Sequence, residues 1–236
     1  MHSLHSSRNP TRMNHQASMT PSIALFRGLE KRDVDLIQAA ATRRTFKATE
    51  TIIRSEDPAL QLFLIDVGAV DYYVLKDDGR KILLHRLLPG NIFGVAAFLA
   101  EPTGYLGSAE AVRVVDANTW DHQAVRRFAT IYPQLAENAL RIALHYVAIY
   151  AKRHISVVTD SAQERLAWVL TNLGSRAGHV LAAGVEIEIR NEDLASLADV
   201  NFFTVSRLLQ RWERRGAIEK TRGKVLIRSP EKMLAA

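Results

Sequence analysis

Apolar and polar positions follow two different periods along this chain, and the change between them predicts where sheet ends and helix begins. Between residues 46 and 120, short apolar and β-branched runs end at glycines or at Asp-Gly, as expected for strands. The clearest runs are 61–67, 69–75 and 81–87. Asp78-Gly79 between two such runs predicts a hairpin turn. Glycines recur every eleven residues at Gly68, Gly79 and Gly90, so we expect a small antiparallel barrel or roll.

A helical period replaces the strand pattern after Pro133 and continues to about Thr159. Apolar residues there form two stripes, which predicts one face against the chain's own domain and one against a partner helix. We assign the first stripe to a dimer interface, formed by Leu135, Ile142, Tyr146, Ile149 and Arg153. The second stripe runs through Leu140, Leu144, Val147 and Ala151. The alternative is a helix buried inside one subunit.

A new helix is predicted directly after the long one. Ser161 and Glu164 have the spacing of a capping box, so a hinge between domains is expected near Asp160-Ser161.

The segment from Asn191 to Gly216 has the pattern of two short helices joined by a tight turn. Asn191 is a good N-cap for the first helix, Asp199-Val200 is the turn, and Asn201 can cap the second. The second helix has a buried stripe at i, i+3, i+4 and i+7, formed by Val205, Leu208, Leu209 and Trp212. Its other face is polar and basic, which predicts a helix-turn-helix that reads a DNA major groove.

Two short apolar runs around Arg222-Gly223 follow the second helix and predict a β-hairpin. A hairpin in this place is the wing of a winged-helix domain, and we expect Arg222 and Lys224 to point at phosphates. Residues 201–228 contain eight basic and two acidic residues, a net charge of +6 that equals the charge of the whole chain. Such a local excess is the electrostatic signature of nucleic-acid binding.

Composition excludes several classes of site. The chain has no cysteine, so disulfides, thiolate catalysis and cysteine-ligated zinc or iron–sulfur centres are ruled out. No apolar run approaches the ~20 residues that span a bilayer, no metal-spaced His/Asp cluster stands out, and no membrane association is expected. Residues 1–20 are polar, lack an apolar signal segment, and are interpreted as a disordered tail of a cytoplasmic protein.

Taken together, these features resemble the cyclic-AMP receptor protein/FNR (Crp/Fnr) family of bacterial transcription regulators. The resemblance runs from about Leu25 to Ile227, and its specific parts are the spaced glycines, Pro89-Gly90-Asn91-Ile92-Phe93-Gly94 and Thr204-Val205-Ser206-Arg207. It implies an α+β chain with a cyclic-nucleotide-binding-like roll, a dimerisation helix and a winged helix-turn-helix, at residues 21–131, 132–160 and 161–236. It also implies a homodimer on a near-palindromic double-stranded operator, and an effector sensed in the roll. An activator of this kind would contact RNA polymerase, but the residues identify no surface for that contact.

The effector pocket departs from the nucleotide-binding members of the family. They have Gly-Glu for the ribose, Arg-Ser for the cyclic phosphate and Thr-Ser for adenine; this chain has Gly94-Val95, Gly107-Ser108 and Tyr150-Ala151 there. With Ala96, these are the residues assigned to the pocket. A phosphate buried without its arginine costs several kcal/mol, so we expect no cyclic-AMP binding in the usual mode.

Other effectors stay open at this stage, and no cofactor is required by the sequence. Some relatives sense gases through haem, for which the candidate ligands are His85, His122, His145, His154 and the tail residues His2, His5 and His15. Cyclic di-GMP is a further alternative for this fold.

The residues assigned to DNA are Asn201, Phe202, Phe203, Thr204, Ser206, Arg207, Arg211, Arg222 and Lys224. Arg207 matches a base-reading arginine of the family, and arginine bonded to guanine contributes about 1–3 kcal/mol of discrimination. Phe202 and Phe203 stand where the cyclic-AMP receptor protein has Arg-Glu, and we expect one of them to touch thymine methyls, with Phe203 at least partly buried. Asn201, Thr204 and Arg211 would hold phosphates.

Two other classes of function are weaker. An enzyme with a DNA-binding appendage would need a nucleophile–base pair, a phosphate loop or paired carboxylates, and no such motif is present. A module that only scaffolds partners would not need a complete winged helix. We therefore expect a non-enzymatic regulator.

Overall fold

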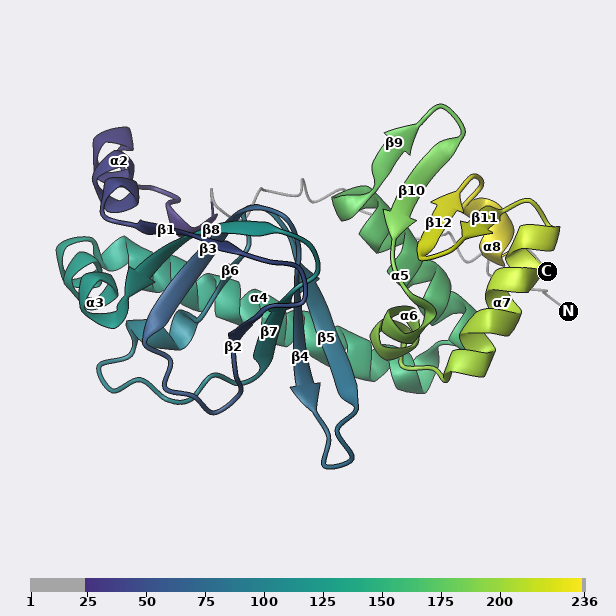
Figure 1. Cartoon of the computed structure of the whole chain (residues 1–236), viewed down its shortest axis with the longest axis horizontal. Helices are drawn as coiled ribbons and strands as arrows, with labels where there is room; N and C mark the ends of the chain where they lie inside the picture. The colour runs from purple at the N-terminus through teal and green to yellow at the C-terminus, as the bar shows by residue number, and fades with distance from the viewer. Residues whose placement is uncertain (1–23, 235–236) are drawn as a thin grey trace, which may run out of the picture.

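Two antiparallel four-stranded sheets form the first domain of the computed structural model, which describes residues 24–234 (Figure 1). The strand orders are β1-β8-β3-β6 and β2-β7-β4-β5, with every pairing antiparallel. The strands are β1 (Thr42–Phe46), β2 (Thr51–Ile53), β3 (Gln61–Val67), β4 (Val70–Leu75), β5 (Lys81–Leu87), β6 (Ile92–Phe93), β7 (Ser108–Ala111) and β8 (Val115–Asp121). The predicted runs 61–67, 69–75 and 81–87 are thus confirmed as strands.

The turns of this roll agree with the glycine spacing. Gly79 has a left-handed backbone with φ 78° in the β4–β5 turn, and its N–H donates to Lys76 O over 2.8 Å. Gly68 has φ 99°, and a Cβ there would lie 2.4 Å from Val114 O. Each position therefore requires glycine for its backbone angle, and Gly68 requires it for space as well.

Strand β3 is buried on both faces, which explains its unbroken apolar run. Phe63 and Ile65 point into the core between the two sheets, while Leu62 and Leu64 pack on the helices outside. The helices on that side are α2 (Lys31–Ala39), α3 (His122–Ile131), α4 (Pro133–Thr159) and the short 3₁₀ turn η1 (Val95–Phe98).

Helix α4 begins at Pro133 and ends at Thr159, as the sequence predicts. It runs the length of the roll and reaches the second domain (Figure 1). Ser161 caps the next helix: its Oγ accepts from Glu164 N over 3.2 Å, and Glu164 Oε2 accepts from Ser161 N over 2.7 Å. The predicted capping box is confirmed.

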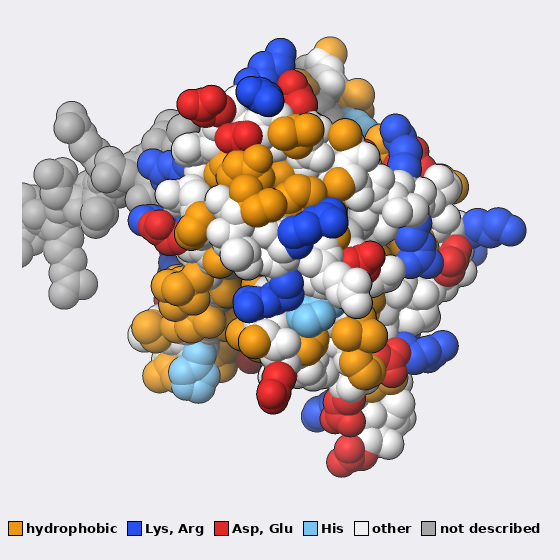
Figure 2. All heavy atoms as spheres, turned by 90° about the vertical axis from the view of Figure 1, so that its left-hand side faces the viewer, with side chains coloured by type: hydrophobic (Ala, Val, Ile, Leu, Met, Phe, Trp, Pro, Cys, Tyr) orange, Lys and Arg blue, Asp and Glu red, His pale blue; other side chains and the backbone are white. Residues whose placement is uncertain are grey.

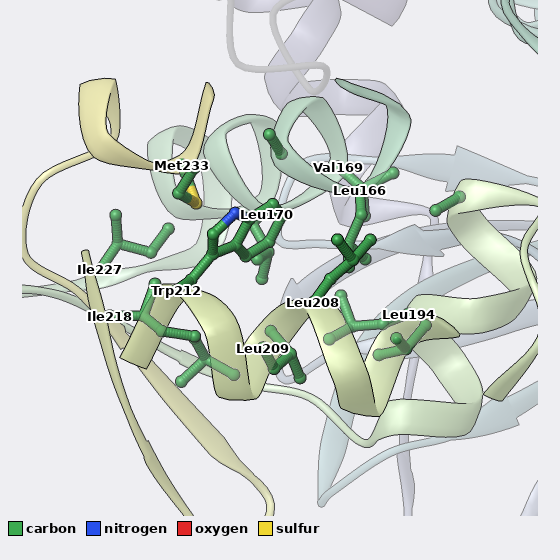
Figure 3. Packing of buried hydrophobic residues seen from close by; sticks show 14 of the residues in the cluster. Leu166, Val169, Leu170, Leu194, Leu208, Leu209, Trp212, Ile218, Ile227 and Met233 are labelled. Atoms are coloured by element: carbon green, nitrogen blue, oxygen red, sulfur yellow. The ribbon is translucent and has the colours of Figure 1, made fainter. Parts of the chain in front are cut away.

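The second domain is a winged helix-turn-helix built around one apolar core. Leu166 and Leu170 on α5 pack against Leu209 and Trp212 on α7, and all four are buried (Figure 3). Its elements are α5 (Ala162–Ala177), β9 (His179–Leu181), β10 (Gly184–Glu188), α6 (Asn191–Ala198), α7 (Phe202–Arg214), β11 (Ile218–Thr221), β12 (Lys224–Ile227) and α8 (Glu231–Leu234). The hairpin β9–β10, which the sequence analysis did not predict, completes the sheet β11-β12-β10-β9.

The fold is thus the α+β arrangement predicted. The tail predicted to be disordered lies outside the described residues. No helix among residues 24–234 is both long and apolar enough to cross a membrane.

Candidate nucleic-acid interface and sensor site

Helix α7 lies at the end of the molecule remote from the roll (Figure 1). Val205, Leu208, Leu209 and Trp212 are buried against α5, α6 and the hairpin, as the stripe predicts. Its other face carries the exposed Phe202, Phe203, Arg207 and Arg211. The helix therefore presents a continuous aromatic and basic face to solvent.

The turn before α7 has the backbone that the sequence analysis expected. Asp199 is left-handed, with φ 51° and ψ 53°. Asn201 Oδ1 accepts a hydrogen bond from Thr204 N over 2.7 Å, so Asn201 caps α7. These two residues fix the direction in which α7 starts.

The aromatic pair at the start of α7 is more open than expected. Phe203 is 82% exposed and Phe202 44%, so the expectation that Phe203 is partly buried was wrong. The two rings meet edge-on, with centroids 6.0 Å apart. The buried stripe of α7 begins at Val205. Phe202 and Phe203 come before that stripe in the first turn, and neither belongs to the core cluster.

The basic residues of this domain divide into exposed groups and internally paired ones. Arg207 is exposed and makes no ion pair within residues 24–234, and Arg222 is exposed at the tip of the wing. Lys224 is paired within the protomer: its Nζ lies 2.8 Å from Glu186 Oε1 and 3.7 Å from Glu188 Oε1 on β10. Those carboxylates raise the pKa of Lys224, whose side chain is 42% exposed. The assignment of Lys224 to phosphates stays a prediction, and these pairs would compete with it.

One assignment near α6 also changes. Arg190, not Asn191, is the N-cap of α6, and Asn191 is its first residue. Asn191 Nδ2 donates to Ser206 Oγ over 3.1 Å, so this amide ties α6 to α7. Ser206 is half-buried and helps to hold the two helices together. Its contact with DNA stays a prediction.

Charge is distributed differently at the opposite end of the molecule. Figure 2 faces the end formed by α2 and α3 and shows Lys and Arg side chains interspersed with Asp, Glu and apolar groups. The excess of basic residues between 201 and 228 therefore distinguishes the α7 end from this one.

Aromatic side chains of the chain itself surround Tyr150, one of the residues assigned to the effector pocket. His85 on β5 lies against Tyr72, Tyr146 and Tyr150, with ring centroids 5.2, 4.6 and 5.8 Å away. Tyr150 Oη is 2.6 Å from His85 Nδ1. Burial, with the guanidinium groups of Arg176 and Arg153, lowers the pKa of His85 to about 4, so the imidazole is neutral at neutral pH. Burial also raises the pKa of Tyr72 and of Tyr146 to about 12.

The positions that hold the nucleotide in relatives are closed here. A Cβ on Gly107 would lie 2.9 Å from Tyr73 O and 3.0 Å from the Tyr72 ring, so an arginine there would displace β4. Gly94 is packed against Gln61 O, and Ser108 Oγ accepts from Ser55 N over 3.0 Å. Val95 and Ala96, in η1, pack on the cores of the roll.

Haem does not fit these residues. Imidazole binds haem iron through a ring nitrogen, and His85 Nδ1 is already bonded to Tyr150 Oη while three tyrosines surround the ring. His122 is bonded to Leu99 O over 2.9 Å, and His145 and His154 are exposed on α4. His2, His5 and His15 lie outside the described residues.

The stripe assigned to a dimer interface faces the chain's own core. Leu135 and Ile142 are 3% and 9% exposed within core clusters, and Tyr146 packs against His85. Arg153 donates to Leu84 O and Ser196 O inside the protomer. These residues cannot form the outer face of α4, and Ile149 is half-buried beside them. The exposed apolar stripe is the second one, with Leu140, Leu144 and Val147 at 57–59% exposure, Ile155 at 60% and Val158 at 79%.

Comparisons with known proteins match both domains. The model of the cyclic nucleotide-binding domain matches residues 43–132, and that of the Crp-like helix-turn-helix domain matches residues 164–236. The chain belongs to the Crp/Fnr family of transcription regulators. Members of the Crp/Fnr family are regulators rather than enzymes, which agrees with the sequence analysis.

Relatives from the Crp/Fnr family are similar over almost their whole length. The "Cyclic AMP receptor protein" of Thermus thermophilus is 28% identical over 211 residues, which cover 86% of this chain and 92% of the relative. The structure of FixK2 from Bradyrhizobium japonicum covers 83% of this chain and 98% of its own, with a TM-score of 0.70 and 22% identity. The c-di-GMP responsive regulator CLP from Xanthomonas campestris covers 84% and 99%, with a TM-score of 0.72 and 15% identity. At these identities the two structures establish the fold alone.

Sequence reasoning missed one group of residues altogether. Arg86, Asp71 and Asp193 meet between the roll and the winged helix. A single charged residue in an apolar strand is a weak signal of an ion pair. Strand alternation shows on which face Arg86 lies, but it does not identify a partner in another domain.

Proposed function

We propose that the protein is a homodimeric, sequence-specific DNA-binding regulator in which α7 enters the major groove. The outer face of α7 carries this proposal, because its inner face is fully used by the core and its outer face is aromatic and basic. The net charge of +6 in residues 201–228 supports a polyanionic partner. We keep the expected cytoplasmic location as part of this proposal.

Roles follow from exposure and chemistry along α7. Arg207 reads a guanine, because an exposed guanidinium can bond guanine O6 and N7 together. Phe203, supported edge-on by Phe202, contacts thymine methyls. Asn201, Thr204 and Arg211 contact phosphates beside the helix, and Arg222 does so from the wing.

Dimerisation uses the exposed stripe of α4. Leu140, Leu144 and Val147 are spaced by four and three residues, which is the spacing of a coiled-coil seam. Two winged helices can reach one duplex only if both lie at the same end of the dimer. The two α4 helices are therefore parallel, and the operator is an inverted repeat.

The filled sensor site argues against cyclic AMP as effector. Tyr72 occupies the space beside Gly107, and Tyr150 and His85 are bonded to each other where adenine binds in relatives. No feature of the described residues favours cyclic di-GMP or haem. We propose that the protein binds DNA without cyclic AMP.

Selection of bound duplexes from random DNA, with purified protein and no added effector, tests this function. We expect an inverted repeat with one invariant guanine per half-site. Arg207→Ala should lose preference at that guanine alone, by about 1–3 kcal/mol. Arg43→Ala, an exposed arginine on β1, is the matched control and should select the wild-type sequence.

Two results would contradict the proposal. Failure of the wild-type protein to enrich any inverted repeat would refute a dimeric reader that is active as purified. Retention of the guanine preference by Arg207→Ala would refute the role of Arg207 alone.

A further inference from the structure

Three consecutive residues of β5 join the roll to the rest of the molecule. Arg153 on α4 donates to Leu84 O over 3.3 Å, Tyr150 on α4 bonds His85, and Arg86 reaches α6. Tyr72 pairs with His85 and Tyr73 with Leu83, so Leu84 is the extra residue of a β-bulge. A bulge leaves its extra residue outside the ladder, and this frees the Leu84 carbonyl for Arg153.

Arg86 bridges two carboxylates that belong to different domains. Its Nε and Nη2 lie 2.6 and 2.9 Å from the two oxygens of Asp71 on β4. Nη2 also lies 3.3 Å from Asp193 Oδ2 on α6, and Nη1 donates to Glu188 O over 2.9 Å. One guanidinium therefore holds a strand of the roll, the end of β10 and the first helix of the winged domain.

This ion cluster is largely shielded from water. The side chains of Arg86, Asp71 and Asp193 are 8%, 16% and 10% exposed. Burial lowers the pKa of Arg86, but the two carboxylates outweigh that effect and the pKa is raised overall. Arg190, at the rim, supplies a second cation to Asp193 over 3.2 Å. Screening by salt is weak for such a buried pair, unlike the exposed pair Arg113–Glu188.

Contacts that fix α6 on the roll also fix α7, because the two helices are joined to each other. Leu194 of α6 and Val205 of α7 are both fully buried in one core, and Asn191 is bonded to Ser206. Arg153 adds a second tie, because it donates to Ser196 O on α6 as well as to Leu84 O on β5. Helices α6 and α7 are therefore packed as one unit, which these contacts tie to the roll.

We propose that Arg86 is a positioning residue for DNA binding: its ion cluster with Asp71 and Asp193 fixes the winged domain on the roll and so sets the spacing of half-sites. This inference rests on the proposed function, because half-site spacing has meaning only for a dimeric reader. In a dimer, the roll and α4 define the frame, and the orientation of each winged domain on that frame defines where each α7 lies along the duplex.

Spacing selectivity is the readout that separates positioning from stability. Adding one base pair between half-sites moves them ~3.4 Å further apart and rotates one about the axis. A rigidly held pair of α7 helices should discriminate against that change by ~10-fold or more. A loosely held pair should tolerate it, whereas a merely destabilised domain would lose affinity equally at every spacing.

The test measures DNA affinity of the full-length protein on the selected operator and on versions with one base pair inserted or removed. We expect Arg86→Met to weaken binding to the best operator by ~10-fold, within the range known for residues that contact neither ligand. The ratio of its affinities for the best operator and for an operator with altered spacing should fall below ~3-fold. Arg86→Lys should be intermediate, because lysine keeps the charge but cannot bridge two carboxylates with a planar fork.

Two further variants keep the test decisive. Asp193→Asn leaves Arg86 paired with Asp71 and should also lose spacing discrimination; it decides the matter if Arg86→Met does not fold. Arg80→Gln, which breaks an exposed pair at the tip of the same β4–β5 hairpin, should retain wild-type discrimination.

Each outcome is informative. A wild-type protein without any inverted-repeat preference refutes the proposed function itself. A wild-type protein that discriminates spacing, together with Arg86→Met or Asp193→Asn variants that keep the wild-type ratio between spacings, refutes the positioning role of Arg86.

Discussion

Phe203 is an exposed aromatic residue at the start of α7. It is 82% exposed, whereas the cyclic-AMP receptor protein has a glutamate there that reads bases. A phenyl ring cannot accept a hydrogen bond from cytosine, but it can bury the C5 methyl of thymine. We therefore expect Phe203 to favour thymine over cytosine at the base that it contacts.

Replacing thymine by deoxyuridine in the half-sites tests this contact, because the two bases differ only by the C5 methyl. We expect wild-type affinity to fall about fourfold per critical thymine, since one buried methyl contributes about 0.8 kcal/mol. In Phe203→Ala the same replacement should have no effect. Leu106→Ala, an equally exposed apolar residue of the roll, should behave like the wild type. Equal sensitivity of Phe203→Ala and wild type would show that another residue reads the methyl.

His85 makes the stability of the protein depend on pH in a definite direction. Its pKa is about 4 in the folded chain, against about 6.5 when unfolded. Between these values only the unfolded chain binds the proton, so the stabilisation is complete above pH 6.5 and is lost toward pH 4. We expect unfolding by urea to show a loss of about 2–3 kcal/mol over this range.

The variant His85→Gln should flatten that part of the pH profile. His179→Gln, at an exposed position on β9, is the control and should keep the wild-type slope. Identical slopes for His85→Gln and wild type would place the acid sensitivity in the carboxylates instead.

At the scale of single elements, the sequence predicted most boundaries and failed where one helix has two apolar faces. Strands such as Gln61–Val67 follow from local composition and from the glycines that end them. Helix α4 has two stripes with the same local pattern, and which of them faces its own roll depends on tertiary packing. The ion pair of Lys224 with Glu186 was not foreseen, because Glu186 lies on the unpredicted hairpin β9–β10.

The outer stripe of α4 predicts how the dimer can be broken. Leu144→Glu places a carboxylate on an exposed apolar seam, and we expect the protein to become monomeric in sedimentation or light scattering. The fold of each protomer should persist, because Leu144 is 57% exposed and lies outside the core clusters. Ile131→Glu, at the similarly exposed end of α3, should leave the dimer intact. A dimeric Leu144→Glu protein would exclude this stripe as the interface.

For the whole molecule, the sequence predicted the parts and their order but not how they are joined. The helix-turn-helix core is local, with Leu194 and Trp212 in one short segment, so its pattern can be recognised. Contacts such as Arg86–Asp193 and Tyr150–His85 join residues far apart in the chain, and no local period marks them. These long-range contacts join the roll to the winged domain and to α4.

The closed roll predicts that cyclic AMP does not stabilise this protein. Entry of the nucleotide would require Tyr72 to leave Gly107 and Tyr150 to leave His85, and its phosphate would be buried without an arginine. A ligand at 100 times its dissociation constant stabilises a fold by about 2.7 kcal/mol. For a chain of this size that is a rise of roughly 5–10 °C in melting temperature. We expect no rise with millimolar cyclic AMP, while the selected operator duplex, added as the control ligand, should give one. A cyclic-AMP-dependent rise in melting temperature or gain in operator affinity would show that the tyrosine cluster opens to admit the nucleotide.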